Sequence, residues 1–344
     1  MVLQVVYCTV AANAIMLLCS NSPSGRAVLS LLGGLLVVVS LPMSEATSPS
    51  SVLAVTSADG TEGMAIITSL LTASGEVRVK ALVSNMSSPE AQALAALGCE
   101  VKLEGSSDAF AGASDALILP PLTADRRQKG LQAITAAAAA GLRQAFLLSV
   151  IGAEQPDAPP SLADYSQLER ALNAKFPATS IILRTFFYSS NLLLWAADTR
   201  AHRALRLPLS GACLAPLYEQ DVAAVVRTLI LTGPGTERCG RALELTGMTW
   251  HAGGTIAAIA SAAIGETIQF DPIDNATAAI ILENAGGLDA SEASLLLDLL
   301  ALQRRATPPS CDGESASNDF HRCTGQKPST LARFFEENAG AFRP

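Results

Sequence analysis

A short turn with the sequence TSADGTEG, residues 56–63, stands between an apolar run at 52–56 and a helix-like stretch at 63–73. A strand that ends in a glycine-bearing turn ahead of a helix brings backbone N–H groups and the positive helix end together, where a pyrophosphate can bind. Gly60 and Gly63 stand where a Cβ would block that approach. A tight turn without phosphate is the alternative, but the place of this turn after the first strand of a βα series favours a nicotinamide dinucleotide site.

After the turn, short β-rich runs alternate with helical stretches, which predicts βαβ units and a parallel sheet. Strands are expected at 52–56, 77–83, 100–103, 116–119, 145–150 and 180–184, with helices at 63–73, 89–97, 124–140 and 161–174. Shorter pieces follow: a helix at 219–231, a strand at 242–245, a helix at 254–264, a helical pair across 276–302 and a last helix at 331–342.

This pattern predicts an α/β fold with a doubly wound, Rossmann-type parallel sheet and a smaller C-terminal α+β cap that binds the substrate. We expect the fold to occupy 51–344, with its core at about 51–190 and the cap at about 191–344, parts of which return to the core.

Residues 1–50 are expected to lie outside this fold, because they carry two apolar runs, at 2–18 and 27–41, around a polar stretch. Both runs are short for a membrane span, and the first basic residue is Arg26, so the positive start typical of a secretory signal is missing. Two interpretations stay open. Either residues 1–42 are a dispensable leader before a start at Met43, or they are an uncleaved signal anchor. We expect a cytoplasmic protein in the first case, and membrane contact or the secretory pathway in the second.

The charge balance argues against nucleic acid as a partner. Charged residues make up 16% of the chain, the formal net charge is -8, and no basic stripe is present, so the field repels a phosphate backbone.

Seven cysteines at unrelated spacings form no CxxC motif and are interpreted as buried or incidental thiols. His202, His251 and His321 show no metal-ligand spacing, so we expect no metal site.

Several short motifs follow the turn in order. They are VKALV at 79–83, GCEV at 98–101, IILRTFF at 181–187, Asn191, QDVA at 220–223, LELTG at 243–247 and TGQKPST at 324–330. Together with the turn, this series resembles the NmrA-like branch of the atypical short-chain dehydrogenase/reductase superfamily, whose first turn reads T-G-A-T-G-x-x-G. The resemblance covers about residues 51–342 and implies an NAD(P)-binding Rossmann domain.

The resemblance also implies where ligands bind, which is the carboxyl edge of the sheet. Phe186, Phe187 and Asn191 are expected to line the substrate pocket. The residues expected to bind the cofactor are Thr56, Ser57, Ala58, Asp59, Gly60, Thr61, Glu62 and Gly63 of the turn, Ser84 and Asn85 after the second strand, and Leu119, Pro120 and Pro121 after the fourth.

Two departures from the family pattern bear on the cofactor. Ser57 stands where the first glycine is usual, and Ser84 stands where NADP-binding relatives commonly place an arginine that pairs with the 2′-phosphate. Ser84 and Asn85 can donate hydrogen bonds but carry no charge, and no acid is placed there to hold the ribose of NAD. The expected cofactor is NADP or NAD, with NADP favoured by the family and its site weakened by Ser84.

A third departure bears on catalysis. Many relatives use Tyr-x-x-x-Lys, in which the tyrosine donates a proton and the lysine lowers its pKa. Here Tyr165 stands where the lysine is expected and Glu169 follows one turn later, and a nearby carboxylate raises a tyrosine pKa. Tyr165 is a candidate catalytic residue or a structural residue at the pocket rim. Ser149, at the end of the fifth strand, is a second candidate, which could bind a substrate carbonyl.

Two functions are compatible with these residues. The first is an NAD(P)-dependent oxidoreductase that passes hydride to a small carbonyl, imine, enone or quinone, as in fungal secondary metabolism, where enzymes often lack Tyr-x-x-x-Lys. The second is a redox-sensing regulator that binds the dinucleotide without turnover and acts on a protein partner. The aromatic residues after the sixth strand and the C-terminal cap favour an enclosed pocket and therefore the oxidoreductase.

Overall fold

The computed structural model describes residues 4–10, 13–19, 27–32, 35–40, 51–73, 77–232, 242–286, 288, 290–305, 311 and 316–343. The chain divides into two compact units, Met1–Pro49 and Ser50–Pro344. In the first unit, β1 (Gln4–Val10), β2 (Asn13–Cys19), β3 (Ala27–Leu32) and β4 (Leu35–Ser40) form an antiparallel sheet in that order. The expectation that residues 1–50 are a leader or anchor stays a prediction.

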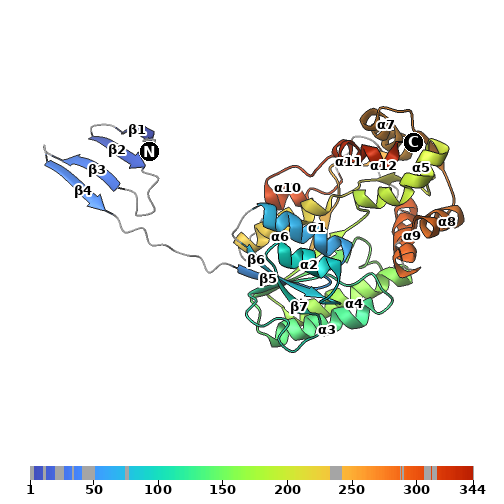
Figure 1. The fold of residues 1–344 in the computed structure, drawn as a ribbon, viewed down its shortest axis with the longest axis horizontal. Helices are drawn as coiled ribbons and strands as arrows, with labels where there is room; N and C mark the ends of the chain where they lie inside the picture. Colours follow the sequence, from blue (N-terminus) through green and yellow to red (C-terminus); the bar gives the residue numbers. More distant parts are fainter. Residues whose placement is uncertain are drawn as a thin grey trace. The chain divides into compact units, whose positions relative to one another are not determined.

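The second unit is built on a seven-stranded parallel sheet in the order β13-β10-β9-β8-β5-β6-β7. The order reverses between β5 and β8, so the carboxyl edge opens into a crevice there. The predicted doubly wound Rossmann-type fold is confirmed (Figure 1). The strands are β5 (Ser51–Val55), β6 (Val77–Val83), β7 (Glu100–Leu103), β8 (Asp115–Ile118), β9 (Gln144–Val150), β10 (Ser180–Thr185) and β13 (Ala242–Leu245).

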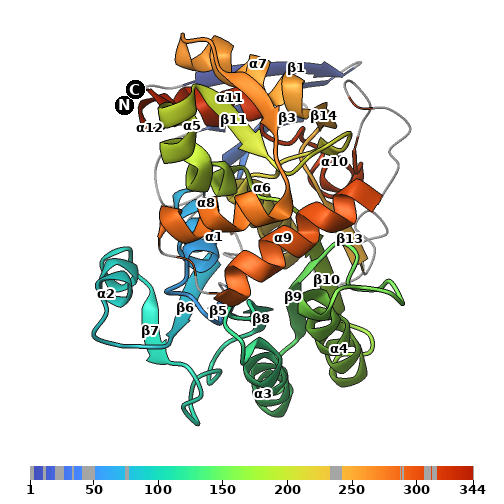
Figure 2. The same ribbon diagram turned by 90° about the vertical axis from the view of Figure 1, so that its right-hand side faces the viewer.

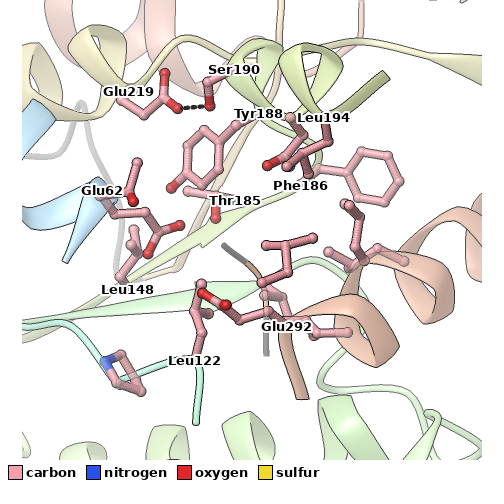
Figure 3. A pocket seen from close by; sticks show the side chains of 18 of the residues that line it. Glu62, Leu122, Leu148, Thr185, Phe186, Tyr188, Ser190, Leu194, Glu219 and Glu292 are labelled. Carbon is pink, nitrogen blue, oxygen red and sulfur yellow. Dashed lines mark hydrogen bonds between the residues drawn. The ribbon is translucent and has the colours of Figure 1, made fainter. Parts of the chain in front are cut away.

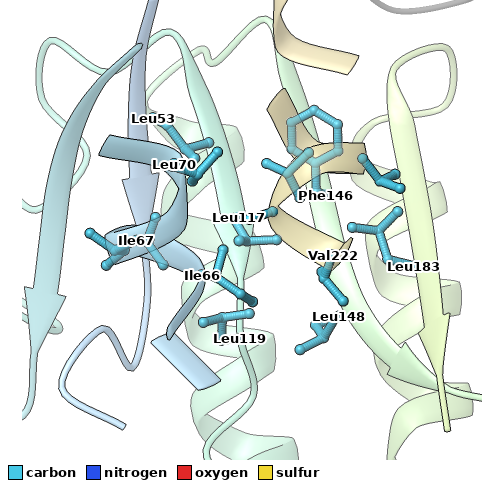
Figure 4. Packing of buried hydrophobic residues seen from close by; sticks show 14 of the residues in the cluster. Leu53, Ile66, Ile67, Leu70, Leu117, Leu119, Phe146, Leu148, Leu183 and Val222 are labelled. Atoms are coloured by element: carbon cyan, nitrogen blue, oxygen red, sulfur yellow. The ribbon is translucent and has the colours of Figure 1, made fainter. Parts of the chain in front are cut away.

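Alternation along the strands explains why helices cover both faces, since successive side chains point to opposite sides. Leu53 and Val55 belong to the buried cluster on one face, whereas Ala54 between them belongs to the cluster on the other. Helices α1 (Thr61–Ala73), α2 (Pro89–Ala96) and α6 (Glu219–Thr232) bury apolar residues on the first face, as Figure 4 shows for α1 and α6. Helices α3 (Arg126–Ala139) and α4 (Pro160–Lys175) pack on the second.

The remaining elements form a third apolar cluster beyond the carboxyl edge. Two small sheets belong to it, β11 (Ala204–Leu207) with β15 (Gln269–Pro272) and β12 (Cys213–Leu214) with β14 (His251–Ala252). None of these four strands was predicted. The helices are the 3-10 helix Ser189–Trp195, α5 (Ala196–His202), α7 (Gly253–Ile264), α8 (Asn275–Ala285), α9 (Ala290–Arg305), α11 (Leu331–Glu337) and α12 (Ala339–Phe342), while α10 (Asp319–Thr324) packs on α6 and β13.

Helices α8 and α9 lie across the end of the sheet at which β9 and β10 finish (Figure 2). The predicted helical pair is confirmed, with its break after Ala285, but the predicted last helix is two helices that meet at Asn338. Ser161 Oγ donates to Asp298 Oδ2 at 2.6 Å and fastens α4 to α9. Among the described helices, none has the length and apolar character that crossing a membrane requires.

Two of the cysteines interpreted as incidental thiols form a disulfide. Cys213, in β12, is bonded to Cys311, which follows α9 at a sequence separation of 98 residues. Cys323 is disulfide-bonded as well, while Cys99 is free and buried. The interpretation as incidental thiols was therefore wrong for these three, because cysteines brought together by the tertiary fold show no characteristic spacing in the sequence.

Candidate functional site

The turn at 56–63 holds the conformation that a phosphate-binding turn needs. Gly60 N–H donates to Ser57 O at 3.0 Å, and α1 begins at Thr61. A Cβ on Gly63 would lie 2.6 Å from Ser57 O and 2.8 Å from the Ala58 Cα, so only glycine lets α1 pack this close to the end of β5.

Ser57, which stands where the family pattern has a glycine, adopts a backbone conformation that favours glycine. Its φ is +46°, in the left-handed region that side chains other than those of glycine, asparagine and aspartate rarely adopt. Its Oγ is buried and meets no hydrogen-bond partner within the described part of the chain. A strained backbone together with an unsatisfied hydroxyl at a helix N-terminus fits a site for an anionic ligand such as a pyrophosphate.

The end of β5 is tied to the segment that follows β8. Thr56 Oγ1 donates to Leu119 O at 3.0 Å and accepts from Leu119 N–H at 2.8 Å, and Thr56 is buried. This pair sets the spacing between the turn and Pro120, which lines the cavity described below.

Two carboxylates lie near the carboxyl ends of β6 and β7, that of Asp59, which belongs to the turn, and that of Glu104. Asp59 Oδ2 accepts from Ser84 N–H at 2.9 Å and from Ser84 Oγ–H at 2.7 Å. Asn85 Oδ1 accepts from Ser87 N–H. Glu104 follows β7. Burial raises the pKa of Glu104 to about 7, the Ser57 backbone opposes the shift, and the charge of Asp59 adds to it.

A cavity of about 300 Å³ extends from the turn along the ends of β9 and β10. It is mainly apolar, and α9 covers it with Leu295, Leu296 and Leu299. Of the described residues that line it, none is a lysine or an arginine, whereas Glu62, Glu219 and Glu292 all reach it.

Glu62 and Tyr188 face each other inside this cavity (Figure 3). Burial raises the pKa of Glu62 to about 7, and the charges of Glu219 and, to a smaller extent, Glu292 raise it as well. The Tyr188 hydroxyl acts in the opposite direction and lowers this pKa. Burial and the Glu62 charge raise the pKa of Tyr188 well above its usual value. Glu219 accepts a hydrogen bond from Ser190, and burial raises the pKa of Glu219 too.

Both candidate catalytic residues lie on the cavity, but neither hydroxyl is prepared for acid catalysis. Ser149 Oγ–H donates to Glu169 Oε1 at 2.6 Å, and Arg184 holds both oxygens of Glu169 at 3.0 and 2.8 Å. Burial raises the pKa of Tyr165, and the Glu62 charge raises it further. The guanidinium of Arg126 lies 5.9 Å from the centre of the Tyr165 ring. The catalytic roles of Ser149 and Tyr165 stay predictions.

The expected substrate residues divide between the cavity and the core. Phe186 and Asn191 line the cavity, whereas Phe187 is fully buried against Trp195 with ring centroids 6.4 Å apart. Sequence reasoning missed the cavity residues Tyr188, Glu219 and Glu292, and the leucines of α9.

Within the described ranges, no three histidines, cysteines or carboxylates lie close enough together to hold a metal ion.

The chain is similar in sequence to a curated reductase and in fold to solved structures of dinucleotide complexes. No family model matches it. It is 28% identical over 240 residues to an NAD(P)H azoreductase of Xenophilus azovorans. The aligned region covers 68% of this chain and 78% of that protein.

Two solved structures share its fold. The NADPH complex of the quinone oxidoreductase QOR2 from Escherichia coli matches with a TM-score of 0.65 and 23% identity, over 83% of this chain and 99% of that one. The NAD complex of NmrA, a negative transcriptional regulator, matches with a TM-score of 0.62 and 14% identity, over 83% and 94%.

Proposed function

Because the chain has the NmrA-like fold of the atypical short-chain dehydrogenase/reductase superfamily, we propose that it is an NAD(P)-dependent oxidoreductase that reduces a small organic molecule. The observation that carries the proposal is the mainly apolar cavity that starts at the turn of residues 56–63 and is lined on one side by α9. A cavity that joins a cofactor turn to apolar walls suits hydride transfer, since it orients the acceptor and excludes water.

The residues of the turn would hold the pyrophosphate through backbone N–H groups and the N-terminus of α1. The dinucleotide supplies hydride chemistry when bound, and the chain supplies position and proton control. Thr61 of the turn and Pro120 after β8 both line the cavity, so we expect them to lie between the cofactor and the acceptor.

The adenosine end of the site favours NADH over NADPH. A 2′-phosphate beyond β6 would meet the carboxylates of Asp59 and Glu104, whereas the two hydroxyls of an unmodified ribose can donate to a carboxylate there. Lys129, whose charge acts on Glu104, is already paired with Asp125 at 3.1 Å.

The acceptor that suits the cavity is an apolar carbonyl, imine, enone or quinone. Its walls are mainly leucines and aromatic rings, and its polar groups include carboxyls, hydroxyls and the Asn191 amide, which can donate a proton or a hydrogen bond. Because the described lining residues include no cation that could hold an acidic substrate, a carboxylate or phosphate acceptor is disfavoured.

The second candidate is a regulator that binds the dinucleotide without turnover. The engagement of Ser149 by Glu169 and the raised pKa of Tyr165 favour it, because neither of these two hydroxyls has a proton readily available for transfer.

One experiment separates the two functions. The purified chain is titrated with NADH and NADPH by fluorescence quenching, and steady oxidation of each is then followed with a panel of quinones, ketones, imines and enones. We expect binding, with oxidation by at least one neutral acceptor class. Binding without oxidation by any of them would support the regulator, and absence of binding would contradict both.

A further inference from the structure

Glu62 is the acidic residue of the turn that lies in the cavity. It is the second residue of α1 and is partly buried. The ionisable groups that act on it are Tyr188 after β10, Glu219 of α6 and Glu292 of α9, and its own charge acts on Tyr165 of α4. All of them are acids or phenols.

This environment keeps the Glu62 carboxyl protonated in a range where exposed glutamates are ionised. An acid in the first turn of a helix is ordinarily stabilised as the anion by the helix dipole. Here burial and the neighbouring Glu219 outweigh that effect and raise the pKa of Glu62 to about 7. A group with a pKa near the working pH is well suited to donate a proton.

Tyr188 provides an independent observation. Its side chain is 6% exposed, and its hydroxyl has no hydrogen-bond partner within the described part of the chain. In Figure 3 this hydroxyl points toward Glu62. A buried hydroxyl without a hydrogen-bond partner costs free energy of folding. We therefore expect a hydrogen-bond acceptor for this hydroxyl to form during function. An ionised Glu62 is such an acceptor.

We propose that Glu62 is the proton donor of the reduction and that Tyr188 is the positioning residue that stabilises its carboxylate. The inference rests on the oxidoreductase function proposed above. The acceptor carbon gains a hydride from the reduced nicotinamide dinucleotide and its C=O or C=N π bond breaks. The O–H bond of Glu62 also breaks, and its proton passes to the acceptor oxygen or nitrogen. Glu62 is left as a carboxylate that accepts from Tyr188, and it regains a proton from water.

The test uses two acceptors that differ in their need for a proton. A neutral quinone or ketone needs hydride and a proton, whereas a permanently cationic carbocation dye needs hydride alone. For Glu62→Gln we expect kcat on the neutral acceptor to fall by about 100-fold or more. On the cationic dye, kcat should stay within a few-fold. Glu336→Gln, an exposed change on α11, is the matched control and should leave both rates unchanged.

The pH profile supplies a second readout. With the neutral acceptor, kcat of the wild type should fall as pH rises through about 7, and Glu62→Gln should remove this step. Tyr188→Phe removes the hydroxyl that opposes the shift and should move the step to higher pH. Glu219→Gln removes a charge that adds to the shift and should move it to lower pH.

Infrared spectroscopy tests the same group without turnover. The protonated-carboxyl absorption that is lost as pH rises through about 7 should be smaller in Glu62→Gln than in the wild type, and the part that remains belongs to Glu104, whose pKa is raised to the same range. Equal losses on both acceptors, or an unchanged pH profile in a variant that still binds dinucleotide, would overturn the role of Glu62. A wild type that binds no dinucleotide would instead overturn the proposed function.

Discussion

Asp59 Oδ2 accepts two hydrogen bonds from Ser84, one from its backbone N–H and one from its hydroxyl. Asp59 belongs to the turn after β5, yet its carboxylate lies at the end of β6, where dinucleotide-binding folds use an acid to hold the ribose of NAD. The sequence alone shows no acid at the end of β6, because the carboxylate comes from a residue 25 positions earlier.

Replacing Asp59 with serine should weaken the preference for NADH. The change removes a negative charge beside the ribose, so the ratio of the NADPH to the NADH dissociation constant should fall by about tenfold, equivalent to about 1.4 kcal/mol. Fluorescence titration with both dinucleotides measures it. Asp271→Ser, which removes an exposed carboxylate on β15, should leave the ratio unchanged. A ratio that does not move in Asp59→Ser would refute the assignment.

Replacing Ser57 with glycine should stabilise the protein. The left-handed conformation costs a residue with a side chain about 1–2 kcal/mol, and the greater freedom of glycine in the unfolded chain offsets part of this gain. Denaturant unfolding should show a net gain of about 0.5–1 kcal/mol. Ser87→Gly, at a turn position without a positive φ, should give no such gain.

Breaking the Arg184–Glu169 pair should be severe. Glu169 is 6% exposed, so Arg184→Met leaves a buried carboxylate without its cation, and we expect the free energy of unfolding to fall by about 3–5 kcal/mol. The double variant Arg184→Met with Glu169→Met should regain most of this. Arg127→Met removes a more exposed pair at 3.8 Å and should cost less than about 1 kcal/mol. Equal losses in the two arginine variants would contradict the prediction.

Removing the disulfide that joins β12 to the segment after α9 should destabilise the protein. The bond between Cys213 and Cys311 spans 98 residues, and a loop of that length gives about 4–5 kcal/mol of stabilisation. Thermal unfolding of the double variant Cys213→Ala with Cys311→Ala should show the loss. Cys99→Ala removes a buried free thiol and should cost much less. A reductant should lower the melting temperature of the wild type more than that of the double variant.

Stability should fall as pH rises from about 4.5 to about 7. The pKa of Glu62 and of Glu104 is raised from 4.5 to about 7 in the folded chain, so the folded state binds more protons than the unfolded state in this window. The slope of the unfolding free energy with pH is then negative for these two groups. Denaturant unfolding across the window measures it, and Glu62→Gln with Glu104→Gln should make the slope less negative.

The parallel sheet could be predicted because its strands are continuous apolar runs between helices with a clear period. The order of β5, β6 and β8 follows from the βαβ pattern, and Gly63 could be placed because the close contact of α1 with the turn allows no other residue. The four short strands of the cap could not, because Cys213 and Leu214 of β12 pair with a partner far along the chain and show no alternation of their own.

The cavity was harder to predict for a related reason. Glu219 and Glu292 reach it from helices remote in the sequence, and each belongs to an otherwise ordinary amphipathic helix. Tyr188 carries a local signal, since it follows the aromatic pair after β10, but nothing in the sequence sets it opposite Glu62. Phe187 was expected in the pocket beside Phe186. Adjacent side chains in extended backbone point opposite ways, and Phe187 points into the core.

The covering of the cavity by α9 has a consequence for biosynthesis. The ribosome synthesises the turn at 56–63 and the ends of β9 and β10 before it adds Leu295, Leu296 and Leu299. Until then the apolar lining residues Leu148 and Val150 lack the cover that α9 provides, and we expect them to be exposed to solvent. A chain truncated ahead of α9 should therefore attract chaperones through these uncovered apolar residues.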